Sequence, residues 1–151
     1  MNEEKLQILA QKQLKEIEKL IKKHLLNYDK KYILESRVKT PYKIRLKQGW
    51  LKNLGKPYEF SDINDIIGFR ICVENEIEVE KLTNYFSDNF NEIDRVDYFN
   101  NPKMNGFKAY LLYFCEEKIE FEIQFMTLEM LEFTNLTHDQ HDELKYGIKI
   151  V

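Results

Sequence analysis

Asp65 and Glu122 are the two acidic residues whose positions best suit the binding of a divalent metal ion. Asp65 directly precedes an apolar run at residues 66–73, and ligand-binding groups of α/β sheets gather at the ends of such strands. Glu122 lies in the run 118–126, where polar and apolar residues alternate as they do along a half-buried strand. An Asp and a Glu from neighbouring strands can hold Mg²⁺ against a triphosphate. The same acidic strand face could equally be an exposed surface.

Basic residues are crowded ahead of this acidic pair. Residues 37–47 hold five of them, and Arg70 adds a guanidinium on the strand that follows Asp65. Phosphoryl transfer needs cations over the transferred phosphates and metal-bearing carboxylates beside them, so the two groups together favour that chemistry. The five basic residues are Arg37, Lys39, Lys43, Arg45 and Lys47. We interpret Lys43 and Arg45 as solvated surface charges.

The composition indicates one compact, soluble domain. The chain has 151 residues, of which 43% are hydrophobic and 32% charged, enough for a core and a solvated surface. The sequence has no apolar run long enough for a membrane span or a secretory signal. Two cysteines in apolar stretches, Cys72 and Cys115, favour buried thiols over a disulfide framework or a zinc site. We therefore expect a cytoplasmic protein without membrane contact.

Charge is divided unevenly along the chain. Residues 1–50 carry 13 Lys and Arg against 6 Asp and Glu, a net charge of +7, whereas residues 51–151 carry 10 against 20, a net charge of −10. Such a division is typical of proteins in which one side faces a polyanion. A lysine-rich helix with a solvated face explains it more simply, and on charge alone we favour that explanation.

Hydrophobic periodicity predicts the elements that position these residues. In chain order we expect helix 3–27, strand 36–39, helix 41–53, strand 66–73, helix 76–90, strand 93–98, strands 107–114 and 118–126 as a hairpin joined at 115–117, and helix 127–145. This order indicates an α+β domain, with an α/β-like alternation, in which helices pack a mixed β-sheet. We divide the chain into a basic amphipathic N-terminal helix, 1–30, and a domain at 31–151 that carries the candidate site.

Four segments of the chain, in order, resemble the motifs of the RelA/SpoT alarmone synthetase domain. They are SRVK at 36–39, DIIGFR at 65–70, DYFNNPKMNGF at 97–107 and EIQ at 122–124. The resemblance extends from about residue 35 to residue 146, and four ordered motifs are far more specific than any one. It implies a nucleotidyltransferase-like mixed sheet, and the chain length resembles that of the small, single-domain synthetases.

The resemblance implies a pyrophosphokinase that uses ATP and Mg²⁺. Such an enzyme transfers the β,γ-pyrophosphate of ATP to the ribose 3′-hydroxyl of GDP or GTP and makes (p)ppGpp. The matching positions imply that Arg37 and Arg70 sandwich adenine and that Lys39 and Lys47 contact the ATP phosphates. Asp65 matches the Mg²⁺-binding aspartate, and Glu122 matches the essential glutamate near the metal and the attacking hydroxyl. We expect neither carboxylate in the hydrophobic core.

The motifs that the resemblance implies bind the acceptor nucleotide depart from the family pattern. Phe107 occupies the position of a tyrosine that stacks on the acceptor base, in the same loop as Lys103 and Asn105, and His138 matches a histidine near the end of the domain. A base stacks on phenylalanine as well as on tyrosine. Polar family residues are replaced by apolar ones at four positions: Ala109, Leu111, Met126 and Leu131.

Three interpretations of function stay open. In order of preference, they are a synthetase of guanosine alarmones, a relative with another acceptor, and an inactive nucleotide-binding protein. The other acceptor would be the tRNA 3′ end, as in toxic members of the family, or an adenosine nucleotide. The basic N-terminal region could bind a tRNA backbone. A binding protein would need neither Asp65 nor Glu122, so their presence together argues against the third interpretation. The resemblance also makes a homo-oligomer possible.

Overall fold

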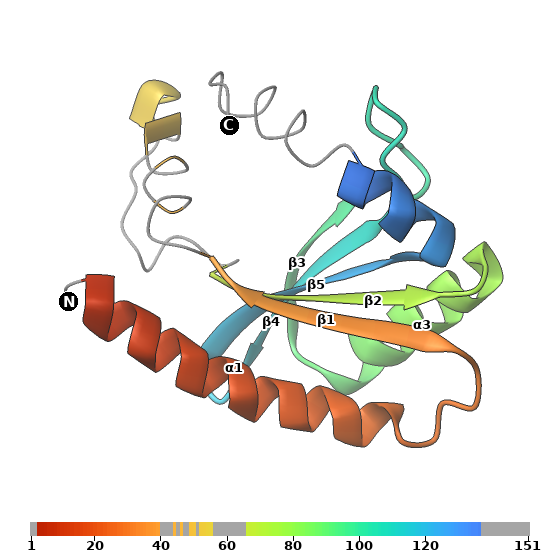
Figure 1. Ribbon diagram of the computed structural model, residues 1–151, viewed down its shortest axis with the longest axis horizontal. Helices are drawn as coiled ribbons and strands as arrows, with labels where there is room; N and C mark the ends of the chain where they lie inside the picture. The colour runs from red at the N-terminus through yellow and green to blue at the C-terminus, as the bar shows by residue number, and fades with distance from the viewer. Residues whose placement is uncertain are drawn as a thin grey trace.

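The computed structural model describes residues 3–39, 44, 46, 49–50, 52–55 and 66–136. Its strands form a five-stranded sheet in the order β1-β2-β5-β4-β3 (Figure 1). β2 and β5 run parallel, and the other neighbours are antiparallel, which confirms the predicted mixed sheet of an α+β fold. The strands are β1 (Tyr32–Val38), β2 (Ile67–Val73), β3 (Glu92–Asp97), β4 (Tyr110–Glu116) and β5 (Ile119–Thr127); the helices are α1 (Glu3–Leu25), α3 (Glu76–Asn89) and a helix at 128–136.

α1 packs against the sheet along one apolar stripe. Its buried residues recur every three or four positions, so they share one face of the helix, and they are Ala10, Leu14, Ile17, Ile21 and Leu25. Leu9 is 38% exposed, because the buried face of the helix passes through the neighbouring Ala10. The lysines of α1 lie outside the stripe. Lys12, Lys15, Lys19, Lys22 and Lys23 are all exposed.

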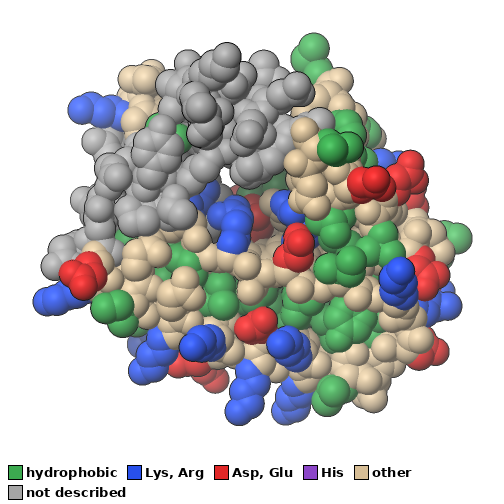
Figure 2. All heavy atoms as spheres, in the orientation of Figure 1, with side chains coloured by type: hydrophobic (Ala, Val, Ile, Leu, Met, Phe, Trp, Pro, Cys, Tyr) green, Lys and Arg blue, Asp and Glu red, His purple; other side chains and the backbone are tan. Residues whose placement is uncertain are grey.

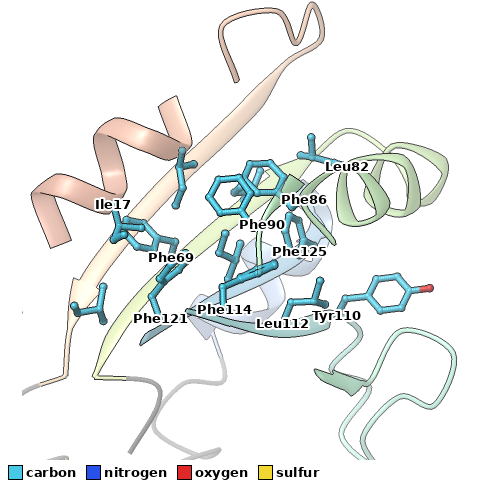
Figure 3. Close-up of a cluster of buried hydrophobic side chains, with 14 of the residues drawn as sticks. Ile17, Phe69, Leu82, Phe86, Phe90, Tyr110, Leu112, Phe114, Phe121 and Phe125 are labelled. Carbon is cyan, nitrogen blue, oxygen red and sulfur yellow. The ribbon is translucent and has the colours of Figure 1, made fainter. Parts of the chain in front are cut away.

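A cluster of phenylalanines fills the space between the helices and the sheet (Figure 3). Phe86 of α3 stacks on Phe90 with ring centroids 5.0 Å apart, and its ring lies 5.5 Å from that of Phe125 on β5. Asn75 is the N-cap of α3, and its side chain accepts a hydrogen bond from the Glu78 amide at 2.9 Å. The cap and the phenylalanines together fix α3 on the face that α1 also covers.

Several predicted boundaries differ from the structure. β1 begins at Tyr32 rather than residue 36, and β4 begins at Tyr110 rather than residue 107. The β4–β5 turn lies at Glu117 and Lys118, one to two residues later than expected, and both have positive φ, as a tight two-residue hairpin requires. The predicted helix 41–53 and the end of helix 127–145 lie largely outside the described residues.

The opposite face of the sheet is divided between polar and apolar residues. Along β2 and β5, the side chains on the face opposite the hydrophobic core are polar at one end of the strand and apolar at the other. The apolar end forms a second cluster, made of Cys72, Ala109, Leu111, Met126 and Leu131. Both cysteines are free thiols. None of the described helices combines the length and the apolar character that crossing a bilayer requires.

The Phe86→Ala substitution tests the phenylalanine cluster. Phe86 is fully buried, so removing its ring should lower the free energy of unfolding by about 3–5 kcal/mol. Ile77→Ala is the matched control, because Ile77 lies on the same helix but is 66% exposed, and its loss should change stability by about 0.5 kcal/mol or less. Denaturant unfolding measures both values, and equal effects would contradict the packing described.

Candidate functional site

A hollow of about 390 Å³ opens on the polar part of the sheet face away from α1 and α3. Figure 2 shows acidic and basic side chains gathered around it near the centre of the view. Its volume falls in the range of small-molecule sites. The charged and polar residues that line it come from β1, β2 and β5 and include Glu35, Arg37, Arg70, Glu122 and Gln124.

Strand register places Arg37 and Glu122 in one row across the sheet. Arg37 pairs with Gly68, and Gly68 pairs with Glu122 on the parallel strand β5. Strands in a sheet lie about 4.8 Å apart, so the two Cα atoms are about 10 Å apart with only a glycine between them. A Cβ built on Gly68 would lie 3.6 Å from the Arg37 guanidinium carbon. The Arg37 side chain therefore lies across the backbone of β2, over Gly68.

A second row carries a chain of hydrogen bonds. Arg70 lies between Glu35 and Gln124 in the register, and it donates from Nη1 to Glu35 and from Nε to Gln124, each at 3.2 Å. Gln124 then donates from Nε2 to Glu122 Oε1 at 3.0 Å. The guanidinium of Arg70 and the carboxylate of Glu122 are thus joined through one amide.

Glu122 is only 3% exposed, although it lies outside both hydrophobic clusters and lines the hollow. The reason is its strand: β5 is the central strand, and Gly68 and Tyr113 flank Glu122 on both sides. A buried carboxylate is costly without hydrogen-bond donors, and Gln124 supplies one.

The described residues include one candidate ligand for Mg²⁺. Glu122 offers carboxylate oxygens of the kind that Mg²⁺ prefers, whereas Glu35, the other carboxylate in the hollow, is paired with Arg70. Among the described residues no three His, Cys, Asp or Glu side chains gather as metal ligands. The donor chemistry therefore fits Mg²⁺ only if Asp65 adds a second carboxylate. Asp65, Lys47 and His138 lie outside the described residues, so their placement stays a prediction.

Lys39 is buried where the chain leaves β1. Its backbone amide donates to the Ile66 carbonyl at 2.6 Å, and its carbonyl accepts from the Gln7 side chain of α1 at 3.0 Å. These two bonds fix Lys39 beside the entry to β2.

The loop between β3 and β4 carries the other predicted residues. The Lys103 ammonium lies 4.7 Å from the ring centre of Tyr98 and 5.2 Å from that of Phe107, within cation–π range of both. The Asn105 side chain accepts from the Phe107 amide at 3.0 Å, so Asn105 shapes the turn. Gly106 has φ +93°, a conformation that favours glycine.

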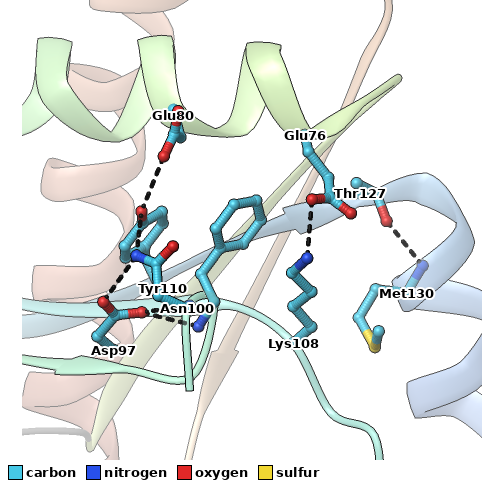
Figure 4. Close-up of polar contacts among 9 residues, drawn as sticks. Glu76, Glu80, Asp97, Asn100, Lys108, Tyr110, Thr127 and Met130 are labelled. Carbon is cyan, nitrogen blue, oxygen red and sulfur yellow. Dashed lines mark hydrogen bonds and ion pairs between the residues drawn. The ribbon is translucent and has the colours of Figure 1, made fainter. Parts of the chain in front are cut away.

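Asp97 anchors the start of this loop (Figure 4). Its carboxylate accepts hydrogen bonds from the Phe99 and Asn100 amides and from the Asn100 side chain, at 2.8–2.9 Å. These bonds, first that of the Asn100 side chain, hold the pKa of Asp97 below its usual value. Asn100 also donates to the Tyr110 hydroxyl, which donates to Glu80 of α3. The loop is therefore tied both to the sheet and to α3.

A family model, described as a region found in RelA / SpoT proteins, matches residues 36–149. The chain belongs to this family. A Rickettsia felis protein whose name refers to ankyrin repeats is 29% identical over 120 residues, and the match covers 76% of this chain and 10% of that protein. The Arabidopsis thaliana protein named "Probable GTP diphosphokinase RSH3, chloroplastic" is 27% identical over 136 residues, 86% of this chain and 18% of that protein. The chain thus spans less than a fifth of the length of these curated relatives.

The fold matches that of a solved small alarmone synthetase. The crystal structure of small alarmone synthetase 1 from Bacillus subtilis, bound to its product pppGpp, has a TM-score of 0.74 and 20% sequence identity to this chain. The match covers 94% of this chain and 82% of that one. The mixed sheet expected from the RelA/SpoT resemblance is therefore confirmed.

The departures from the RelA/SpoT motifs converge in space. Ala109, Leu111, Met126 and Leu131 all belong to the second apolar cluster, together with Cys72. Burial raises the pKa of the Cys72 thiol to about 12, and the charge of Arg70 opposes this. The replacements are not consecutive in the sequence, yet together they form one buried apolar patch beside the polar row of Arg70 and Gln124.

The presence of Glu35 in the hollow and a role for Gln124 were not predicted from the sequence. Glu35 is one of many exposed acids in the sequence, and only the pairing of β1 with β2 sets it opposite Arg70. Gln124 belongs to the EIQ motif and to the alternating face of β5, so its place on the strand was visible in the sequence. Its hydrogen bonds to two other strand residues were not.

Asp97→Ala should loosen the loop between β3 and β4 and make the free energy of unfolding less dependent on pH in acid. At pH 7 we expect a loss of about 1–3 kcal/mol in the free energy of unfolding, because two backbone amides lose their acceptor. Asp97 has a lower pKa folded than unfolded, so it stabilises the fold above about pH 4 and this contribution disappears as pH falls through the folded-state pKa. The difference between variant and wild type should therefore shrink in acid.

Asp94→Ala is the control for this experiment. Asp94 lies on the same strand and is exposed, and its carboxylate accepts a hydrogen bond from the adjacent Arg95 amide. Unfolding followed by circular dichroism between about pH 2 and pH 7, which is about two units below to about three units above the usual Asp pKa, measures both variants. A constant difference between Asp97→Ala and wild type across this range would contradict the assignment.

Proposed function

We propose that this protein is an ATP-dependent pyrophosphokinase that transfers the β,γ-pyrophosphate of ATP to the 3′-hydroxyl of GDP or GTP. The observation that carries the proposal is the hollow in which Arg37, Arg70, Gln124 and Glu122 come together from three strands. Membership of the RelA/SpoT family and the name of the Arabidopsis relative support it. So does the product bound to the Bacillus subtilis protein of the same fold.

The arginines supply the adenine site in this proposal. The Arg37 side chain lies over Gly68, and Arg70 is held in place by Glu35 and Gln124. Planar guanidinium groups stack on aromatic rings, which an ammonium group cannot do in the same way. Adenine would bind between the two arginines, and Lys39 with Lys47 would neutralise the phosphates.

Glu122 is the proposed catalytic carboxylate. The 3′-hydroxyl oxygen of the acceptor attacks the β-phosphorus of ATP, the bond between that phosphorus and the α,β-bridging oxygen breaks, and AMP leaves. The hydroxyl proton passes to Glu122. Mg²⁺ held by Glu122 and Asp65 would neutralise charge on the phosphates.

The position of α1 favours a mononucleotide acceptor over tRNA. The buried residues of α1 share a cluster with Phe69 and Ile123, which point to the opposite side of the sheet from Arg70 and Glu122. The lysines of α1 and the hollow thus lie on different faces. A nucleic acid that used both would have to pass around the edge strand β1, whereas a nucleotide at the Lys103–Phe107 loop would not.

Glu122→Gln should abolish transfer while the protein stays folded. Removing the proton acceptor should lower turnover by about 10²-fold or more, because glutamine keeps the shape and the hydrogen bonding but not the charge. Glu120→Gln is the matched control, since Glu120 lies two residues earlier on β5 and is exposed. The assay is transfer of label from γ-labelled ATP with Mg²⁺. Near wild-type turnover by Glu122→Gln would refute the mechanism.

Replacing Lys15, Lys19 and Lys22 with glutamine distinguishes the acceptors. For GDP or GTP we expect rates within about twofold of wild type and a weak response to salt, because few phosphates are contacted. GDP, GTP, AMP and bulk tRNA are offered in parallel across salt concentrations, with AMP testing the adenosine acceptor. Labelling of tRNA that falls steeply with salt and is lost in the triple variant would instead establish the tRNA interpretation.

A further inference from the structure

We propose that Gln124 is a positioning residue that serves both halves of the site through one side-chain amide; this inference rests on the proposed function. Its oxygen accepts from Arg70 Nε at 3.2 Å, and its nitrogen donates to Glu122 Oε1 at 3.0 Å. Gln124 carries no charge, so the pairing of cations with carboxylates does not assign it a role. It touches neither ATP nor the acceptor in this scheme and acts through its two neighbours.

The two partners fix the orientation of the amide. Arg70 Nε–H can only donate, and an ionised Glu122 carboxylate can only accept. Turning the amide over would set its NH₂ group against the guanidinium and its oxygen against the carboxylate, so both bonds would be lost at once. Only one orientation satisfies both neighbours, and each bond involves a charged partner, the stronger kind of hydrogen bond.

The surroundings of Gln124 make it a rigid link. Gln124 lies on the central strand, paired with Arg70 on one side and with Leu111 on the other. Arg70 is held from its far side by Glu35, and Glu122 is buried. A displacement of Gln124 therefore moves the guanidinium proposed to stack on adenine and the carboxylate proposed to accept the proton.

The two functions of the amide can be separated by two substitutions. Gln124→Glu keeps an oxygen for Arg70 but replaces the donor to Glu122 with a like charge, so turnover should fall about tenfold or more while ATP affinity stays within about twofold. Gln124→Leu removes both bonds, so ATP affinity and turnover should each fall by about tenfold. A merely structural role would not split affinity from turnover in this way.

The experiment measures the affinity for a non-hydrolysable ATP analogue by calorimetry and turnover with γ-labelled ATP, GDP and Mg²⁺. Glu120→Leu, an exposed position on the same strand face, is the control, and melting temperatures verify that each variant folds. Equal affinity losses in Gln124→Glu and Gln124→Leu would overturn the inference, as would wild-type values in Gln124→Leu. If Gln124→Leu does not fold, the Gln124→Glu variant still tests the inference. A loss of ATP affinity in Gln124→Glu, or a turnover equal to that of wild type, would overturn it.

Failure of the proposed function has a different signature. A wild-type protein that binds the ATP analogue but labels no acceptor would refute the pyrophosphokinase, and the affinities of the two Gln124 variants would still test the link to Arg70. A wild-type protein that does not bind the analogue would overturn both proposals.

Discussion

The parallel pairing of β2 with β5 is the constraint on which the candidate site depends. It sets Gly68 opposite Glu122 and Arg70 opposite Gln124, so residues more than 50 positions apart in the sequence become neighbours on one face. Side chains alternate between faces with a period of two, and a shift of one residue would exchange the polar residues for the phenylalanines and isoleucines of the core. The hydrophobic core therefore enforces the register that assembles the hollow.

The same constraint explains why a buried carboxylate is tolerated. Glu122 is flanked on both sides by neighbouring strands, and an unpaired charge there would be strongly destabilising. The amide of Gln124 satisfies one carboxylate oxygen and is itself held by Arg70, which is held by Glu35. Stability and site geometry thus draw on one set of hydrogen bonds, and Glu35 at the edge strand is their outermost member.

The sequence predicted the parts of this site that depend on local periodicity. Alternation along residues 118–126 correctly placed Phe121, Ile123 and Phe125 in the core and Glu122 on the other face. It did not predict the burial of Glu122 or the pairing of Glu35 with Arg70, because both depend on which strands become neighbours. The roles of Asp65, Lys47 and His138 still rest on the RelA/SpoT resemblance.

The contrast between the two parts of the open face has a physical consequence for ligand binding. The polar row of Glu35, Arg70 and Gln124 presents directional hydrogen-bond donors and acceptors. Two residues further along β2 and β5, the side chains of Cys72 and Met126 are fully buried. The donors and acceptors on the edge of a base lose hydrogen bonds to water when they are buried, and an apolar cluster offers no hydrogen bonds in exchange. Discrimination between bases by hydrogen bonding is therefore unfavourable there. If the protein has the proposed function, selectivity for the acceptor base would therefore come from groups outside that cluster, and among the described residues the loop of Lys103 and Phe107 offers a cation and a ring for this purpose.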